Sequence, residues 1–466
     1  MDKIQILDQN VDKIVGASSK IRDLLNALID EKSLVETDVF LSGKSFLDGS
    51  DALGEGVVTG YAFIGGNPVY LFAHSEVLSG SLGKAQADKI AKNLYAAEKA
   101  GVPFVSIIDS AGARIGEGIS VCEGYSKIIK AANDISGGVP HIAVVKGACS
   151  GLMSVYASTA DFIIADEKAR LSVNSPVVVA AKSKAQTDAL SAKTLSSKTD
   201  DVALTYKTTA ELKAKLSELI ELLPSDDSYV AAEGYTDDLN RETASLNDGA
   251  SAAEILKAVF DDGRYTELYE GVAGEVRCVI GRIAGVTTAA AASDSSVNKF
   301  ITLAGIKKFS RFLYAVSAFN IPLVNFVDSK GIEPSLDGEY SGLSAAAAEL
   351  MTNVALSENR KISVITGNAI GFAYSAFASK SIGYDYVFAA VGSVISPITQ
   401  EVAAVLFGDD ELKKSSDPIA KRAELIKKYS EDSANPYIAA KDGYVDNIIE
   451  PALLRAHIAS ALTMLV

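Results

Sequence analysis

Two glycine-rich turns in the first half of the chain carry residue types that could do chemistry. One, residues 109–118, reads DSAGARIGEG after an apolar run. The other, residues 147–151, reads GACSG before a helix expected near Leu152. Backbone amides at strand ends and helix starts lack partners, so two such turns can direct amides at one oxygen that becomes negative during a reaction. Glycine lets that oxygen approach because it carries no side chain. The pattern predicts an oxyanion site.

The second half of the chain contains the same pair of turns. Residues 328–331 read DSKG and residues 367–371 read GNAIG, again after apolar runs. A lone glycine at a strand end usually does no more than make a turn. Recurrence of the same glycines in both halves makes two ligand pockets an equal alternative to ordinary turns.

Cysteine chemistry is a competing hypothesis for the turn at 147–151. Gly147, Cys149 and Gly151 have the spacing of a hydrolase nucleophile elbow, with cysteine as the nucleophile. A catalytic triad also needs a histidine, and the chain has three: His74, His141 and His457. His457 alone follows in the right chain order, and its context, LLRAHIASAL, is typical of an amphipathic helix. The pattern therefore disfavours a cysteine hydrolase.

Two further motifs are expected to carry no chemistry. Residues 80–84, GSLGK, resemble a phosphate-binding loop, but Leu78 stands where its first glycine belongs and Ala85 where its serine or threonine belongs. We expect this stretch to cap the following helix instead. The pairs Asp226-Asp227 and Asp261-Asp262 lack metal-ligand spacing and are expected on solvated faces. No metal site is predicted.

An internal repeat fixes the architecture. Residues 89–110, KIAKNLYAAEKAGVPFVSIIDS, align without gaps with residues 308–329, KFSRFLYAVSAFNIPLVNFVDS. Lysine, leucine, tyrosine, proline and the terminal Asp-Ser recur at identical places. The glycine-rich turns follow at nearly the same offset, so we predict two tandem copies of one α/β fold.

Each copy is predicted to combine a hairpin with parallel strands. In the first copy, GVVTGYAFI and PVYLFAHS flank a Gly-Gly-Asn-Pro turn, Lys84 to Lys99 has a helical apolar face, and PFVSIID and HIAVVKG are short buried runs. Residues 181–250 are polar, contain one expected helix from Ala210 to Leu223, and are interpreted as the boundary. Ser251 to Glu254 is a capping box that opens the second half. The predicted domains are residues 1–240 and 250–466.

Composition excludes several classes of protein. The chain has 466 residues, 48% of them hydrophobic, and a net charge of −15, which disfavours nucleic acid and anionic lipid as partners. Three scattered cysteines, Cys122, Cys149 and Cys278, support neither a disulfide framework nor a zinc site. The N-terminus lacks the apolar core of a signal peptide, and no run approaches 18 apolar residues. We expect a soluble, cytoplasmic protein.

Beyond these patterns, the sequence resembles the carboxyltransferase (beta-type) subunits of biotin-dependent acyl-CoA carboxylases, transcarboxylases and acyl-CoA decarboxylases. The resemblance spans nearly the whole chain. It rests on residues 54–83, 109–118 (DSAGARIGEG), 147–162 (GACSGLMSVYASTADF), 319–331 (FNIPLVNFVDSKG), 365–380 (ITGNAIGFAYSAFASK) and 434–451 (ANPYIAAKDGYVDNIIEP). It implies two tandem crotonase-like domains of the ClpP/crotonase superfamily, built as β-β-α spirals, with the acyl-CoA side in residues 1–240 and the biotin side in residues 250–466.

The resemblance also implies roles for individual residues. Backbone amides would hold the thioester oxygen in the first half and the biotin ureido oxygen in the second, so no side-chain base is required. The implied catalytic residues are Gly112, Ala113, Ser150, Gly151, Gly371 and Phe372. The implied substrate-binding residues are Gly80, Ser110, Arg114, Gly147, Gly331 and Ala373. Where this chain has Leu152 and Phe372, relatives usually carry a second glycine.

The implied activity is carboxyl transfer between carboxybiotin and a short acyl-CoA of the propionyl, acetyl or methylmalonyl type. Alternatives are the alpha subunit of a biotin-dependent acyl-CoA decarboxylase, a CoA-thioester hydrolase or hydratase, and a non-catalytic assembly subunit. No methionine precedes a lysine, so the biotin would sit on a separate carrier. Implied partners are a biotin carboxyl carrier protein with a biotin carboxylase or membrane decarboxylase subunits, and other copies of this chain, hexameric in the family. Helices containing residues 345–350 and 453–465 are candidates for that interface or for the core.

Overall fold

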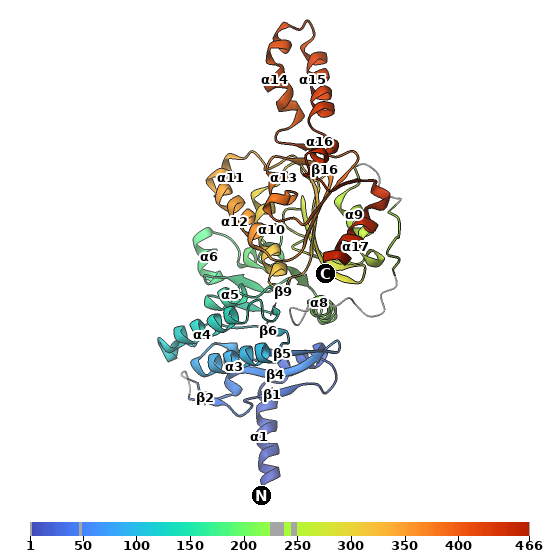
Figure 1. Ribbon diagram of the computed structural model, residues 1–466. Coiled ribbons are helices and arrows are strands. Elements are labelled where there is room, and N and C mark those ends of the chain that lie inside the picture. The colour runs from blue at the N-terminus through green and yellow to red at the C-terminus, as the bar shows by residue number, and fades with distance from the viewer. Residues whose placement is uncertain (1, 46–48, 224–236, 244–248, 466) are drawn as a thin grey trace. The chain divides into compact units, whose positions relative to one another are not determined.

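The computed structural model describes residues 2–45, 49–223, 237–243 and 249–465. Its residues divide into two compact units, 1–228 and 229–466, each built around its own sheet. Figure 1 shows helices packed against strands in both units. Among the described residues, no helix is long and apolar enough to cross a membrane.

The main sheet of the first unit runs in the order β1-β4-β5-β6-β7-β9-β11. β4 and β5 form an antiparallel hairpin, and the strands from β5 onward are parallel. The strands of this sheet are β1 (Val35–Thr37), β4 (Val57–Ile64), β5 (Asn67–His74), β6 (Phe104–Ile108), β7 (His141–Val145), β9 (Phe162–Asp166) and β11 (Leu204–Tyr206). Two short ribbons accompany it: β2 (Ser42–Lys44) with β3 (Asp51–Leu53), and β8 (Ala148–Ser150) with β10 (Arg170–Ser172).

The helices of the first unit include the crossovers that join the parallel strands. They are α1 (Lys3–Ala17), α2 (Ser19–Leu28), α3 (Lys84–Ala100), α4 (Ser120–Asp134), α5 (Leu152–Ala157), α6 (Pro176–Ser183), α7 (Ala192–Leu195) and α8 (Thr209–Leu222). The α3 helix ends where Gly101 takes a left-handed conformation, φ 66°, that releases the chain from the helix. α3 and α4 bury Ile90, Leu94 and Ile128 against β6 and β7.

The second unit repeats this plan. Its sheet runs in the order β12-β13-β14-β15-β16-β17-β19, with an antiparallel hairpin followed by parallel strands. The strands are β12 (Tyr265–Leu268), β13 (Val276–Ile283), β14 (Val286–Ser293), β15 (Leu323–Ser329), β16 (Lys361–Ile370), β17 (Tyr386–Ala390), β18 (Val394–Ser396), which pairs with β16, and β19 (Asn447–Ile449). The predicted tandem duplication is therefore confirmed.

The helices of the second unit include the long hairpin seen at the top of Figure 1, formed by α14 and α15. They are α9 (Ala252–Val259), α10 (Leu303–Ser317), α11 (Leu336–Tyr340), α12 (Leu343–Leu356), α13 (Phe372–Phe377), α14 (Gln400–Lys414), α15 (Pro418–Asp432), α16 (Pro436–Lys441) and α17 (Leu454–Leu465). The predicted capping box is present: Ser251 and Glu254 bond each other's backbone amides at the start of α9. α17 buries Leu454, Ile458 and Leu462 in the core of its unit, the second of the two roles considered for it.

The polar segment 181–250, in which the boundary was predicted, contains the division between the two units at residues 228 and 229. Its strand β11 pairs in parallel with β9 and completes the first sheet. Backbone pairing does not depend on side-chain polarity, so a polar sequence can still supply an edge strand. The predicted helix from Ala210 is observed as α8, which starts one residue earlier.

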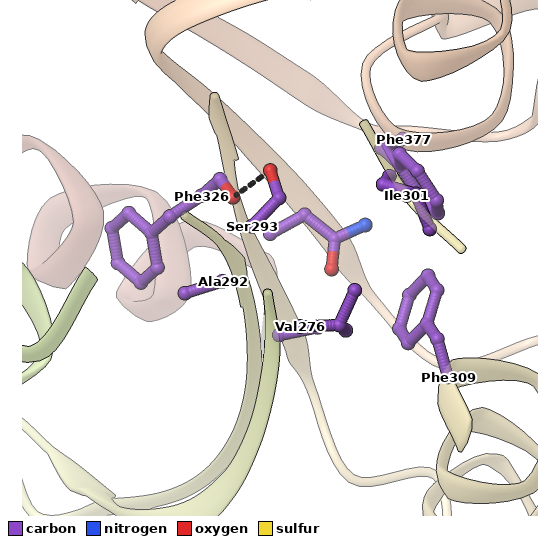
Figure 2. Close-up of a pocket in the computed structure, with 9 residues that line it drawn as sticks. Val276, Ala292, Ser293, Ile301, Phe309, Phe326 and Phe377 are labelled. Carbon is purple, nitrogen blue, oxygen red and sulfur yellow. Dashed lines mark hydrogen bonds between the residues drawn. The ribbon is translucent and has the colours of Figure 1, made fainter. Parts of the chain in front are cut away.

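The two cores are packed differently at one place. Ala291 of β14 pairs with Asn325 of β15, as Phe72 of β5 pairs with Ser106 of β6 in the first unit. Ala291, where the first unit has a phenylalanine, lines a small cavity in the second unit. In Figure 2, Phe309, Phe377 and Ile301 lie on one side of this cavity and Phe326 with Ala292 on the other.

Candidate active site

The first turn of the first unit follows β6 and is held by backbone pairing to residues 79–82. The Leu82 amide donates to the Gly112 carbonyl at 2.8 Å, and the Arg114 amide donates to the Leu82 carbonyl at 2.8 Å. The Gly112 amide donates to Ser110 Oγ at 3.2 Å. The Ala113 amide has no hydrogen-bond acceptor among the described residues. Ala113 is therefore the open donor of this turn, whereas the Gly112 amide is already engaged.

The second turn leads from β8 into α5. The Gly151 amide donates to the Ser172 carbonyl of β10 at 3.0 Å, so it is not the open donor that the sequence analysis expected. Alternation along the strand turns the amide of Ser150, a predicted donor, away from β10, and this amide has no acceptor among the described residues. Leu152 is the first residue of α5, and its amide has no acceptor in the part of the chain that the structure describes. Sequence reasoning missed this donor, although its position at a helix start is the signal that could have found it.

Side chains predicted to bind substrate in the first turn instead hold the backbone. Arg114 is buried, with Nη1 2.6 Å from a Glu55 carboxylate oxygen and 3.2 Å from Glu117. Its Nη2 donates to the carbonyls of Glu55 and Ser81. The guanidinium group is thus committed to the protein, and direct contact with substrate is not supported. Ser110 is buried as well and donates from Oγ to the Gly80 carbonyl at 2.8 Å.

Gly80 and Gly147, two glycines predicted to contact substrate, lie close to atoms of Asp109. A Cβ on Gly80 would lie 2.4 Å from the Asp109 carbonyl oxygen, and Gly80 also has a φ of +62°. A Cβ on Gly147 would lie 2.3 Å from the Asp109 carboxylate. Real Cβ atoms do not come so close to oxygen, so a side chain at Gly80 would clash with the backbone and one at Gly147 would displace the Asp109 carboxylate. These glycines shape the turns.

The second unit repeats the backbone bonds of the two turns and the serine bond that braces the first of them. The Ile301 amide donates to the Gly331 carbonyl at 2.8 Å, and the Gly331 amide donates to Ser329 Oγ at 3.2 Å. The Gly371 amide donates to the Ser396 carbonyl at 2.9 Å. As in the first unit, the predicted glycine amides are engaged.

The open donors of the second unit are the neighbours of those glycines. The amides of Ile332 and Phe372 lack an acceptor among the described residues, and Phe372 is the first residue of α13. Phe372 was predicted from the sequence, whereas Ile332 was not. Ala373 has its methyl group buried in the core. Each unit therefore has an open amide after the fourth strand of its main sheet, β6 or β15, and another at the start of a short helix, α5 or α13.

The structure argues against the cysteine alternative. Cys149 is fully buried, and burial raises the pKa of its thiol well above its ordinary value. A thiol that stays protonated is a poor nucleophile. His74 and His141 are also buried, and burial lowers the pKa of each to about 3. His457 lies on α17 with Nδ1 3.0 Å from the Leu453 carbonyl, as expected for one position on a helix.

The phosphate-loop lookalike at residues 80–84 is also not a phosphate site. Gly83 is the N-cap of α3, and the Lys84 amide donates to Glu117 Oε2 at 2.8 Å. A carboxylate already occupies the position that an anion would need. The Lys84 ammonium pairs with Asp88 at 2.7 Å.

One expectation about the aspartate pairs is wrong. Asp261 does not lie on a solvated face, because its carboxylate accepts from the amides of Ala284 and Gly285 and pairs with Arg455 at 2.8 Å. It anchors the hairpin turn between β13 and β14. Asp262 is exposed, as expected. Asp226 and Asp227 lie outside the described residues.

Comparison with known proteins agrees with this duplicated arrangement of turns. Residues 18–466 match the model of the carboxyl transferase domain. The 12S subunit of methylmalonyl-CoA carboxyltransferase from Propionibacterium freudenreichii subsp. shermanii is 32% identical over 95% of this chain and 88% of its own. Methylmalonyl-CoA decarboxylase subunit alpha from Veillonella parvula is 32% identical over 100% of this chain and 96% of its own.

A solved structure extends the similarity to three dimensions. Transcarboxylase 12S, solved as a hexamer with methylmalonyl-coenzyme A and methylmalonic acid bound, superposes with a TM-score of 0.94 at 29% identity, over 99% of this chain and 94% of that one. Its likeness identifies the two units as crotonase-like domains. With a family match over residues 18–466 and relatives at 32% identity along nearly their whole length, this chain belongs to the carboxyl transferase domain family.

Proposed function

We propose that this chain is the carboxyltransferase subunit of a biotin-dependent enzyme and moves a carboxyl group between biotin and a short acyl-CoA of the propionyl or methylmalonyl type. The observation that carries this proposal is the duplicated pair of open amides. We take the amides of Ala113 and Leu152 as one pair and those of Ile332 and Phe372 as the other, because Asp109 and Asp328 each link the two turns that carry them. A reaction that passes through an enolate on each of two partners needs two such pairs.

The first pair is proposed to receive the thioester oxygen of the acyl-CoA. Removal of an α-proton or of a carboxyl group from the acyl chain places negative charge on that oxygen. Two N–H groups directed at it stabilise the charge without a titratable side chain. This agrees with the buried Cys149, His74 and His141, none of which is suited to act as a nucleophile or base at neutral pH.

The second pair is proposed to receive the ureido oxygen of biotin. Biotin fits here because that oxygen accepts two hydrogen bonds, and because Gly331 and Gly371, at φ +112° and +55°, place no side chain beside the amides of Ile332 and Phe372. When bound, biotin supplies the ureido nitrogen that carries the carboxyl group. The residues of this chain bind and orient it through main-chain donors. Residues 1–240 would then form the acyl-CoA side and residues 250–466 the biotin side.

The decarboxylating direction is a second candidate, and one observation favours it. This chain covers 96% of the Veillonella parvula decarboxylase alpha subunit but 88% of the transcarboxylase 12S subunit. The same two pairs of amides serve either direction, since the intermediates of a reversible reaction are shared.

Assembly is part of the proposal. Biotin is placed on a separate carrier protein, because no methionine in this chain precedes a lysine. A biotin carboxylase or membrane decarboxylase subunits would complete the complex. By analogy with transcarboxylase 12S, whose structure is described as a hexamer, we propose a homo-oligomer, and we place it in the cytoplasm.

Turnover with a panel of thioesters tests the proposal. Purified protein is incubated with free biotin and malonyl-, methylmalonyl- or glutaconyl-CoA, and the acyl products and CO2 are measured with and without biotin. We expect loss of the carboxyl group that is fastest with methylmalonyl-CoA, proceeds slowly without biotin and is accelerated by biotin, with intact thioesters throughout. Release of free CoA thiol at a rate independent of biotin would instead identify a thioester hydrolase. Folded protein that turns over none of the three would favour an assembly subunit.

A further inference from the structure

Asp109 links the two turns of the first unit. It is the residue after β6 that begins the first turn, and its Oδ1 accepts a hydrogen bond of 3.0 Å from the Ala148 amide in the second turn. The carboxylate lies so close to Gly147 that a Cβ there would be 2.3 Å from Oδ1. Lys146 Nζ lies 3.8 Å from Asp109 Oδ2, and the Asp109 side chain is 43% exposed. The carboxylate therefore fills the space between the turns while its other edge faces solvent.

Asp328 makes the same link in the second unit. Its Oδ1 accepts from the Asn368 amide at 2.7 Å and from Asn368 Nδ2 at 2.8 Å. A Cβ on Gly367 would lie 2.3 Å from this Oδ1, and Ser295 Oγ donates to Oδ2. The identical residue thus contacts equivalent atoms in both units, at sequence separations of 39 and 40 residues. In both units the aspartate of the first turn thus bonds an amide of the second turn, which indicates that its role is to connect the two turns.

The serine that follows each aspartate fixes the other end of its turn. Ser110 Oγ accepts from the Gly112 amide, and Ser329 Oγ accepts from the Gly331 amide, each at 3.2 Å. The aspartate reaches forward to the second turn, and the serine braces the first. The open amides of Ala113 and Leu152 lie on these two turns, as do those of Ile332 and Phe372.

We propose that Asp109 and Asp328 are positioning residues that set the separation of the two open amides in each unit. The inference rests on the function proposed above, because it assigns the amide pairs to oxyanion binding. Neither carboxylate is proposed to touch substrate or biotin. Each holds an amide four residues before the donor at the helix start, and a bond to a charged acceptor is stronger than one between neutral groups.

Comparing Asp109→Ala with Asp109→Asn distinguishes the proposed positioning of the amides from a general effect on the stability of the fold. Asparagine keeps a carbonyl oxygen at the place of Oδ1 and can still accept from Ala148, whereas alanine cannot. Asp328→Ala and Asp328→Asn are the matched pair in the other unit. Because both aspartates lie at strand ends and are partly exposed, we expect all four variants to fold.

The first readout is amide hydrogen exchange, which needs no activity. In Asp109→Ala we expect peptides covering residues 146–153 to exchange at least about tenfold faster, while peptides covering 366–373 are unchanged. Asp328→Ala should give the reverse. The asparagine variants should stay within about threefold of the wild type in both peptides. Unchanged exchange in residues 146–153 of Asp109→Ala would overturn the inference, whatever the enzyme catalyses.

The second readout is the two half-reactions, each measured without the other substrate. Loss of CO2 from methylmalonyl-CoA in the absence of biotin reports on the first unit, and loss of CO2 from added carboxybiotin in the absence of acyl-CoA reports on the second. Asp109→Ala should slow the first about 10²-fold and leave the second within twofold, since small misplacements of oriented groups are costly. Asp328→Ala should do the opposite, and each asparagine variant should recover at least a tenth of the lost rate.

The failures of the two proposals are distinguishable. A wild-type protein that performs neither half-reaction contradicts the proposed function, while hydrogen exchange still decides whether the aspartates hold the turns. A wild-type protein that performs both, with alanine variants that slow both halves equally, keeps the function and overturns the assignment of one aspartate to one pocket.

Discussion

The buried ammonium of Lys89 donates a hydrogen bond of 2.8 Å to the carbonyl oxygen of Val57 at the start of β4. It also donates to the Gly54 carbonyl at 3.3 Å. Lys308 occupies the repeated position in the second unit and donates to the Val272 carbonyl at 2.9 Å. Both lysines are almost fully buried, so each ties its helix to the backbone that precedes the hairpin.

Replacing Lys89 by methionine should destabilise the protein. Methionine fills much of the same volume but leaves the Val57 and Gly54 carbonyls without their donor, at a cost of about 1–3 kcal/mol per unsatisfied group. Urea unfolding of Lys89→Met against the wild type measures the difference. Lys84→Met, at an exposed lysine of the same helix, is the control and should change stability by less than about 0.5 kcal/mol. Equal effects of the two changes would contradict a structural role for Lys89.

The same lysine predicts a pH dependence. Burial lowers the pKa of Lys89 to about 8 from its ordinary 10.5. Between these values the unfolded chain keeps the proton that the folded protein has lost, so the free energy of unfolding should rise with pH across this interval. Below pH 8 both states are charged and the contribution is constant. Unfolding curves of wild type and Lys89→Met from about pH 7 to 10 should therefore diverge, and parallel curves would show that the shift is absent.

Deleting one main-chain donor should impair catalysis without affecting the fold. Leu152 is the first residue of α5, a position that accepts proline because its N–H has no helical partner. Leu152→Pro therefore removes the open amide and little else, and we expect carboxyl transfer to fall roughly 10²-fold with an unchanged melting temperature. Leu152→Ala keeps the amide and is the control. A proline variant as active as the alanine variant would exclude this amide as an oxyanion donor.

Phe372→Pro is the corresponding change in the second unit. It should slow CO2 loss from carboxybiotin by a similar factor. The loss of CO2 from methylmalonyl-CoA without biotin should stay within about twofold of wild type, because the amide that is removed belongs to the pair formed with Ile332. Phe372→Ala again keeps the donor. If Phe372→Pro slowed only the acyl-CoA half-reaction, the assignment of biotin to this unit would be reversed.

Replacing Cys149 by alanine should keep most of the activity. The Cys149 thiol is buried, and burial raises its pKa, so the side chain packs in the core and does not form a thiolate at neutral pH. We expect a loss of about 1 kcal/mol in stability and transfer rates within about threefold of wild type. Steady-state kinetics beside a thermal unfolding curve measures both. Abolished turnover in a folded Cys149→Ala protein would revive the nucleophile hypothesis.

Filling the cavity of the second unit should stabilise it. Ala291 lines the space shown in Figure 2, so the two methyl groups added by Ala291→Val enter existing volume, and we expect a gain of about 1 kcal/mol in unfolding free energy. Ala290 is the control, because it lies in the packed core beside it and has no such space. Ala290→Val should cost about 1–3 kcal/mol by overpacking. A loss of stability in both variants would mean that the cavity cannot accept the added carbons.

The architecture could be predicted from the sequence because the same sequence pattern occurs twice in the chain. The strand ends at Asp109 and Asp328, the helices between them and the following turns recur at one offset, and a repeated apolar pattern specifies the same elements in each copy. The β11 strand was missed because Leu204–Tyr206 is short and lies within a polar segment. Its pairing with β9 is a long-range contact that no local pattern signals.

The turns that carry the candidate site could be placed from the sequence, but their open amides could not. Which amide is open depends on distant partners: the Ser172 carbonyl accepts from the Gly151 amide, and the Ser396 carbonyl accepts from that of Gly371. Arg114 looked like a ligand contact because it is charged and lies in a functional turn. Its partner, Glu55, is 59 residues earlier in the chain, and only the fold reveals that the two meet.

Because the proposed oxyanion donors are backbone N–H groups, the side chains at these positions can change while the donors are kept. Leu152 and Phe372 have different side chains, but each presents an N–H group at the start of its helix. Single mutations at these two positions could therefore remodel the wall around a ligand while the oxyanion donors stay in place. Such a scaffold can acquire new acyl-CoA preferences by small steps, none of which requires passing through an inactive protein.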